Sequence, residues 1–139
     1  MNDDGSRSRY VSCLTGTQLH RLAYREWGDP ANPRVVVCVH GLTRNSRDFG
    51  PLGRALSDRW RVIAADMPGR GASERLADPM LYQVPTYVAN AVTLLARLEA
   101  RAWQAVIAWL LVRGLGAGEV PETCRREVLR FVAYEHFFL

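Results

Sequence analysis

Residues 35–42, which read VVVCVHGL, decide the fold. The run from Val35 to Val39 is rich in β-branched residues and does not alternate with polar ones, which is typical of a parallel strand buried on both faces. A histidine, a glycine and a leucine follow at its carboxyl end, where open α/β sheets place their functional sites. The stretch therefore predicts a central strand with a candidate site at its end.

The segments before this strand predict further β structure. Two short strands are expected between Tyr10 and Glu26, because a turn signal at residues 15–17 separates two segments and the second alternates in hydropathy. The proline- and glycine-rich residues 28–33 indicate a loop. Residues 1–9 are expected to be a disordered lead.

The segments after the central strand alternate between helix and strand patterns. Residues 46–58 have helical spacing with an N-cap at Asn45 or Ser46, but Pro51 indicates that the helix is short. Residues 60–65 predict a second apolar strand. Residues 85–100 predict a helix whose apolar face is formed by Val88, Val92, Leu95 and Leu98.

This order of elements predicts the fold class. Strands and helices that alternate with short links favour parallel strands joined by crossover helices. We therefore expect an α/β fold with a mostly parallel sheet.

Composition narrows the class of partner. The 139 residues suffice for one domain, and 48% apolar with 23% charged residues is typical of a globular protein. The net charge is +4, and all of the positive side-chain charge comes from arginine, since the sequence has no lysine. The arginines are dispersed among acidic residues. A nucleic-acid binder usually concentrates its positive charge, so no nucleic-acid partner is expected.

Cysteine spacing and apolar runs bear on metal, membrane and location. Cys13, Cys38 and Cys124 share no short spacing, so neither a disulfide framework nor a metal site is expected, and a reducing cytoplasm fits. The polar N-terminus lacks the apolar stretch of a signal peptide. The longest apolar run, residues 105–112, is far shorter than the ~20 residues of a membrane span.

A second motif follows the next predicted strand. Residues 66–73 read DMPGRGAS, again at the carboxyl end of a strand. His-Gly after one strand and D-x-x-G-x-G-x-S after the next resemble the α/β-hydrolase family over about residues 18–100. The resemblance implies a partial α/β-hydrolase sheet. For the family it implies a cofactor-free, esterase-like serine hydrolase acting on a small ester or a related acyl or C–C bond substrate.

The resemblance assigns roles to both loops. The backbone N–H of Leu42 would be an oxyanion-hole donor, because acyl transfer builds negative charge on a carbonyl oxygen. Gly41 would let the backbone approach the ligand, and His40 would brace the loop. The alternative for His40 is a hydrogen-bonded histidine at a strand end without a functional role. Four residues would form a structural loop: Asp66, Gly69, Gly71 and Ser73.

No catalytic residue is recognisable in the chain. In the family a serine elbow, G-x-S-x-G, follows a fifth strand. No serine here has glycine at both flanking positions, and Ser73, which has Gly71, has Arg75 in place of the second glycine. His136, the last histidine, has no sequence context for the role of general base. An oxyanion loop without nucleophile and base cannot cleave an ester at a useful rate.

Residues 101–139 form a divergent tail of strand and helix character. Residues 102–112 predict a strand or a continuation of the preceding helix, and residues 122–138 predict a helix. The glycines at 114, 116 and 118 indicate a turn, although a phosphate cradle is a weaker alternative. We expect hydrolase sequence up to about Ala100 and a frameshift, truncation or fusion after it.

Two functional hypotheses remain open. The first is a truncated, inactive hydrolase, and the second is a non-catalytic module that keeps the hydrolase crevice and binds a small ligand. If the tail leaves residues 35–39 unpaired, the exposed sheet edge is expected to cause self-association. If residues 105–112 pair there instead, a sheet of five parallel or mixed strands results.

Overall fold

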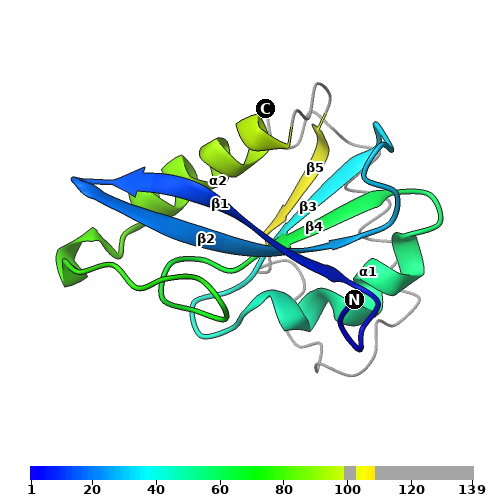
Figure 1. Cartoon of the computed structure of the whole chain (residues 1–139), viewed down its shortest axis with the longest axis horizontal. Coiled ribbons are helices and arrows are strands. Elements are labelled where there is room, and N and C mark those ends of the chain that lie inside the picture. The colour runs from blue at the N-terminus through cyan, green and yellow to red at the C-terminus, as the bar shows by residue number, and fades with distance from the viewer. Residues whose placement is uncertain (99–102, 109–139) are drawn as a thin grey trace.

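The computed structural model describes residues 1–98 and the backbone of residues 103–108. It contains one five-stranded sheet with the strand order β1-β2-β4-β3-β5. Figure 1 shows the two α-helices on opposite sides of this sheet. The sheet and its two helices are therefore the layers of an α/β structure, as the alternation of strands and helices predicts.

The first two strands form a long hairpin. β1 (Arg7–Thr15) pairs antiparallel with β2 (Gln18–Trp27) along their whole length. Gly16 makes the turn with a φ of 59°, which favours glycine. The disordered lead expected at residues 1–9 is not observed, because β1 begins at Arg7 and the indole Nε1–H of Trp27 donates to the Asp4 carbonyl at 3.0 Å.

The sheet is mixed, so the expectation of a mostly parallel sheet is wrong. β2 pairs antiparallel with β4 (Arg61–Ala65), whereas β3 (Val35–Val39) pairs parallel with β4. The cause is the short loop of residues 28–34, which reverses the chain between β2 and β3. The crossover after β3 makes β4 parallel to β3, so β4 runs against β2. The parallel half of the sheet starts only at β4.

The central strand is paired on both edges. β5 (Trp103–Ala108) lies parallel to β3, with Val37 opposite Val106 and Val39 opposite Ala108. Residues 103–108 are thus a strand, and residues 109–112 lie outside the described part of the chain. The condition for an unpaired edge at residues 35–39 is therefore not met, and the self-association that depended on it stays a prediction without this support.

The first crossover carries a short helix, as Pro51 indicated. A 3-10 turn, η1 (Ser46–Phe49), leads into α1 (Gly50–Leu56). The Asn45 side chain accepts a hydrogen bond from the Arg47 N–H at 2.9 Å, so Asn45 is the N-cap. This cap ends the loop that leaves β3 and fixes where the backbone turns away from the sheet.

The second crossover contains η2 (Pro79–Leu81) and α2 (Val84–Arg97). The expected apolar face of α2 is wrong in part, because Val88 and Val92 are exposed while Asn90 and Leu94 are buried. The Asn90 side chain reaches Thr15 at the hairpin end, and its amide donates to Thr15 Oγ1 at 3.2 Å. This polar contact sets the rotation of the helix against the hairpin.

Each face of the sheet has its own apolar core. The α1 side packs around Trp27, Phe49 and Trp60, and the α2 side packs around Leu22, Ile63 and Leu94. β3 contributes to both, with Val36 and Cys38 on one face and Val35 and Val37 on the other. This two-sided burial is why the sequence of β3 does not alternate.

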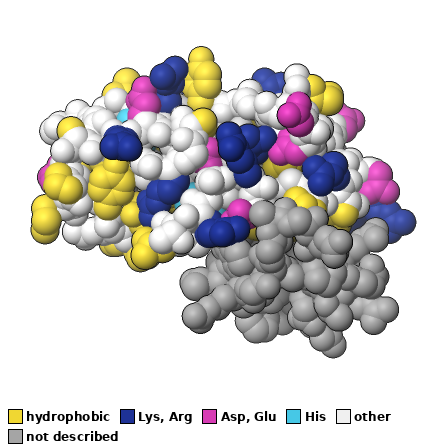
Figure 2. Space-filling view, turned by 90° about the horizontal axis from the view of Figure 1, so that it is seen from below, with side chains coloured by type: hydrophobic (Ala, Val, Ile, Leu, Met, Phe, Trp, Pro, Cys, Tyr) yellow, Lys and Arg dark blue, Asp and Glu magenta, His cyan; other side chains and the backbone are white. Residues whose placement is uncertain are grey.

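Charged side chains are interleaved over the surface. Figure 2 shows arginine side chains among acidic ones on the face seen from below the view of Figure 1. The buried Glu26 carboxylate pairs with Arg61 Nε at 2.6 Å and with Arg9 Nε at 3.0 Å. Burial alone would raise the pKa of Glu26, but these guanidinium groups hold it below its usual value. Within the described residues, neither helix is long and apolar enough to cross a bilayer.

A pair of glycine substitutions tests the packing of α1. A Cβ on Gly53 would overlap the Trp27 indole ring, whereas a Cβ on Gly50 would meet its nearest neighbours at 3.6 Å, an ordinary contact. We expect Gly53→Ala to lower the free energy of unfolding by about 1–3 kcal/mol through overpacking. Gly50→Ala, the matched control, should be neutral or slightly stabilising. Urea unfolding followed by circular dichroism measures both, and equal effects would contradict the packing described.

Candidate functional site

The loop after β3 presents an unpaired backbone donor. A turn over residues 41–44 is closed by the Arg44 N–H, which donates to the Gly41 carbonyl at 3.1 Å. In the described part of the chain, the N–H of Leu42 has no acceptor. The Leu42 side chain is 77% exposed. A free N–H beside an exposed apolar side chain can serve a ligand that carries a carbonyl oxygen.

His40 joins this loop to the loop after β4. Its imidazole is buried, Nδ1 lies 2.7 Å from the Gly41 carbonyl oxygen, and the Met67 N–H donates to Nε2 at 2.9 Å. Because the Met67 N–H can only donate, Nε2 must be unprotonated and Nδ1 must carry the proton. Burial lowers the pKa of His40, so the neutral form that this geometry requires is favoured.

Asp66 is a second link between the loops. Its buried carboxylate accepts from the Ser46 N–H at 2.7 Å and from the Ala72 N–H at 3.0 Å. The Asp66 N–H donates to the Ala23 carbonyl of β2 at 2.9 Å. One residue therefore holds the start of η1, its own loop and the hairpin in a fixed arrangement.

The two glycines of the second loop each have a steric reason. Gly69 and Gly71 adopt φ values of 76° and 53°, where L side chains are strained. A Cβ on Gly71 would overlap the Asp66 carboxylate, and a Cβ on Gly69 would lie 2.8 Å from the Tyr82 hydroxyl. Gly71 therefore lets the loop close around the Asp66 carboxylate, and Gly69 leaves room for Tyr82.

Ser73 connects the loop to the sheet. Its hydroxyl donates to the Asp66 carbonyl at 2.6 Å and accepts from the Ala23 N–H at 2.8 Å. The residue is 8% exposed. With its proton and a lone pair engaged by backbone groups, the hydroxyl is not presented as a nucleophile.

Arg70 is the site residue that sequence reasoning missed. Its Nε donates to the Leu42 carbonyl at 3.1 Å, and its Nη1 donates to the Pro68 carbonyl at 2.9 Å and lies 3.3 Å from the Tyr87 hydroxyl. The guanidinium also lies over the Tyr87 ring, 5.1 Å from its centroid. The one available signal was its place between Gly69 and Gly71, in the loop that follows the strand next to β3.

The predicted residues thus come together as one unit. His40, Gly41 and Leu42 stand against the loop of Asp66, Gly69, Gly71 and Ser73 through the contacts given above. His136 and the glycines at 114, 116 and 118 lie outside the described residues. Over the part of the chain that the structure describes, no three His, Cys, Asp or Glu side chains are grouped to hold a metal ion.

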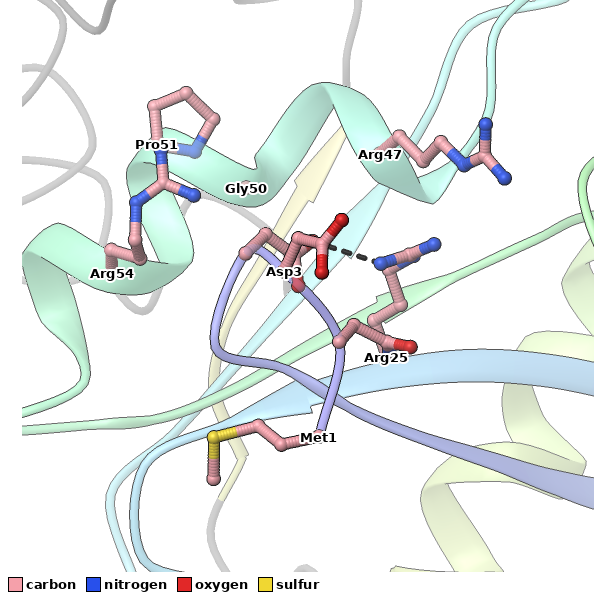
Figure 3. A pocket seen from close by; sticks show the side chains of 9 residues that line it. Met1, Asp3, Arg25, Arg47, Gly50, Pro51 and Arg54 are labelled. Atoms are coloured by element: carbon pink, nitrogen blue, oxygen red, sulfur yellow. Dashed lines mark hydrogen bonds and ion pairs between the residues drawn. The ribbon is translucent and has the colours of Figure 1, made fainter.

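A polar cavity lies elsewhere, between the N-terminal turn and α1. It has a volume of about 620 Å³, and Figure 3 shows Arg47, Arg54 and Arg25 around it. The Arg25 guanidinium forms an ion pair with Asp4 at 2.9 Å. A smaller cavity of about 310 Å³ shares Arg25 and Arg47 with it and reaches Asp66 and Gly71. Neither cavity is lined by His40, Gly41 or Leu42, so neither belongs to the loop with the free donor.

Comparison with known proteins gives a consistent picture. The family described as alpha/beta hydrolase fold matches residues 34–120. The 3-hydroxybutyrate-oligomer hydrolase of Cupriavidus necator is 47% identical over 125 residues, which are 88% of this chain and 42% of that protein. A serine hydrolase-like protein of Danio rerio is 42% identical over 64 residues, 46% of this chain and 19% of that protein. The chain spans less than half the length of these curated relatives.

Solved structures agree in fold. An alpha/beta hydrolase from Novosphingobium aromaticivorans is 37% identical with a TM-score of 0.61 and covers 75% of this chain and 34% of its own. The thioesterase domain from the curacin biosynthetic pathway has a TM-score of 0.66 at 21% identity, covering 74% of this chain and 35% of its own, and supports the fold alone. The family match continues past Ala100, where the motifs had indicated that the likeness ends.

The hydrogen bonds of His40 predict its tautomer and its titration. We expect the Nδ1–H tautomer and a folded-state pKa below the unfolded value of 6.5. A lowered pKa means that the unfolded state binds more protons between the two values. The stability that His40 contributes is therefore complete above pH 6.5 and is lost as the pH falls through its folded pKa.

Imidazole ¹⁵N NMR over a pH titration measures both quantities. His20 is also buried with a lowered pKa, so the difference in pH-dependent stability between the wild type and His40→Gln isolates the contribution of His40. An Nε2–H tautomer would contradict the bond from Met67.

Proposed function

Because the chain belongs to the alpha/beta hydrolase fold family, we propose that it forms the oxyanion-binding part of an ester hydrolase. The observation that carries the proposal is the Leu42 N–H, which has no acceptor among the described residues although its loop is fixed on both sides. A fixed, unpaired donor at the carboxyl end of a central strand has the geometry that stabilises a developing oxyanion.

The surrounding residues keep this donor in place. His40 braces the loop from beneath through the Met67 N–H, and Arg70 fixes the Leu42 carbonyl on the other side. A donor that is already oriented costs no reorganisation when charge develops on the substrate oxygen. His40 is assigned a bracing role and no proton transfer, because both of its ring nitrogens are engaged by backbone groups.

The proposed substrate is a short-chain ester of a small hydroxy acid. The support is the 47% identity to a protein named 3-hydroxybutyrate-oligomer hydrolase, over 88% of this chain. The exposed Leu42 side chain supplies an apolar surface for a short aliphatic group next to the donor. No cofactor is required for hydrolysis of such a bond by a serine hydrolase.

Turnover is a separate matter from binding. No serine in the 139 residues has glycine at both −2 and +2, and Ser73 is engaged by the backbone. We propose that these residues alone bind the ester without cleaving it, and that nucleophile and base would have to come from other polypeptide. The second candidate, a module whose own function is ligand binding, rests on the same observation.

Two experiments on the purified chain test the proposal. We expect saturable binding of methyl 3-hydroxybutyrate, seen as a shift of the Leu42 amide signal in ¹⁵N NMR, and no release of nitrophenol from p-nitrophenyl butyrate. Leu42→Pro, which removes the N–H, should bind the ester about fivefold more weakly than Leu42→Ala. This factor corresponds to the loss of one hydrogen bond of ~1 kcal/mol. Leu42→Ala keeps the N–H and is the matched control.

The outcomes separate the hypotheses. Labelling of any serine by a fluorophosphonate, with nitrophenol release, would show that a nucleophile exists in these residues. Equal binding by Leu42→Pro and Leu42→Ala would contradict the proposed role of the Leu42 N–H as a donor to the ester. Absence of ester binding to the wild type would reject both the oxyanion-binding part and the binding module.

A further inference from the structure

Arg70 has an unusual combination of burial and charge. The described arginines that are half-buried are Arg7, Arg25, Arg61 and Arg70. The first three pair with the carboxylates of Glu26 or Asp4. Arg70 alone among these has no ion pair within the described residues. A cation withdrawn from water without a counter-ion is costly unless another anion arrives.

The guanidinium of Arg70 is fixed by hydrogen bonds from two of its three nitrogens. Nε and Nη1 donate to carbonyl oxygens of Leu42 and Pro68, and the ring of Tyr87 lies beneath. Nη2 has no acceptor among the described residues. Because the side chain is already ordered by neutral groups, its remaining donors can bind an anion with little further loss of conformational entropy.

The position of these donors relates them to the proposed oxyanion donor. Arg70 Nε contacts the carbonyl of Leu42, the same residue whose N–H is unpaired. Leu42 thus joins a neutral N–H donor and an exposed apolar side chain to the positive charge of Arg70, which its carbonyl oxygen holds. Esters of hydroxy acids that end in a free carboxylate combine the matching features, namely a carbonyl oxygen, a short aliphatic chain and a negative charge.

We propose that Arg70 is a specificity-determining residue that binds the free carboxylate of a hydroxy-acid ester, next to the oxyanion donor at Leu42. The inference rests on the proposed function, because it places the charge of the substrate relative to the ester that Leu42 binds. It adds a preference that the fold alone does not imply: the acid end of an oligomer is bound, and an uncharged ester is bound less tightly. The Nη2 hydrogens of Arg70 can donate charge-assisted hydrogen bonds to such a carboxylate.

The test compares two probes with the same ester bond. The linear dimer of 3-hydroxybutyrate carries one ester and one free carboxylate, and its methyl ester lacks the charge. We expect the wild-type chain to bind the acid on the order of tenfold more tightly than the methyl ester, because charge-assisted hydrogen bonds are stronger than neutral ones. The preference should shrink with added salt.

Variants locate the preference. Arg70→Gln should bring the ratio of the two affinities close to one, since the charge is removed and the methyl ester is unaffected by it. Arg75→Gln is the matched control, because it makes the same charge change at an exposed arginine in which no ion pair is found among the described residues. Thermal melts by circular dichroism check that both variants fold.

Each outcome bears on the inference. Loss of the preference in Arg70→Gln but not in Arg75→Gln supports it, and an equal loss in both would reduce it to net charge and overturn it. Equal binding of the acid and the methyl ester by the wild type overturns the role proposed for Arg70 and leaves the proposed function intact. Binding of neither probe overturns both the role of Arg70 and the proposed function. The side-chain ¹⁵N signals of Arg70 in the wild type should shift with the acid only; no shift overturns the inference even if Arg70→Gln fails to fold.

Discussion

The buried carboxylate of Asp66 is the interaction on which the rest of the site depends. It receives N–H groups from the start of η1 and from its own loop, while its backbone N–H is bonded to β2. Each of these donors would otherwise be an unpaired polar group close to the core. The carboxylate in turn tolerates burial because charge-assisted hydrogen bonds replace its hydration. Removing the side chain would release the start of η1 and the loop of residues 66–73, whereas the backbone bond from Asp66 to β2 would remain.

The two ends of β4 are stabilised by different chemistry. At its carboxyl end neutral donors meet the Asp66 carboxylate, and at its amino end Arg61 meets the Glu26 carboxylate, which arginines of β1 also contact. Both carboxylates lie almost out of contact with solvent. Between them the strand contributes only apolar side chains to the two cores. The candidate site therefore lies at the carboxyl end of β4, and the buried ion pairs lie at its amino end.

Among the described residues, the site has hydrogen-bond donors and a positive charge but presents no nucleophile. Leu42 offers an N–H, Arg70 offers a cation with two unused hydrogens, and Ser73 has its hydroxyl committed to the backbone. Such a set fits the proposed binding of a carbonyl compound, whereas bond cleavage also needs a group that attacks. In the proposed function, the described residues supply the binding groups and not the attacking group.

Much of the fold and part of the site followed from the sequence, and the reason is local. The unbroken apolar run of Val35–Val39 reports burial on both faces, and the hairpin, the second strand and the capped short helix are set by residues next to them in the chain. The motifs at 40–42 and 66–73 are also recognisable in the sequence, because glycine is needed wherever a side chain would overlap a neighbour. A side chain at Gly71, for example, would overlap the Asp66 carboxylate.

What the tertiary structure decided was every contact between distant segments. The sheet is mixed because β2 pairs with β4. Asn90 is buried where it bonds to Thr15, whereas Val88 and Val92 are exposed. The N-terminal residues contact Trp27 through the carbonyl of Asp4. The meeting of Arg70 with Leu42 belongs to the same class. Amino-acid pattern specifies which backbone a segment prefers, but the partner of a polar group across 28 residues of chain depends on how the strands are ordered in space.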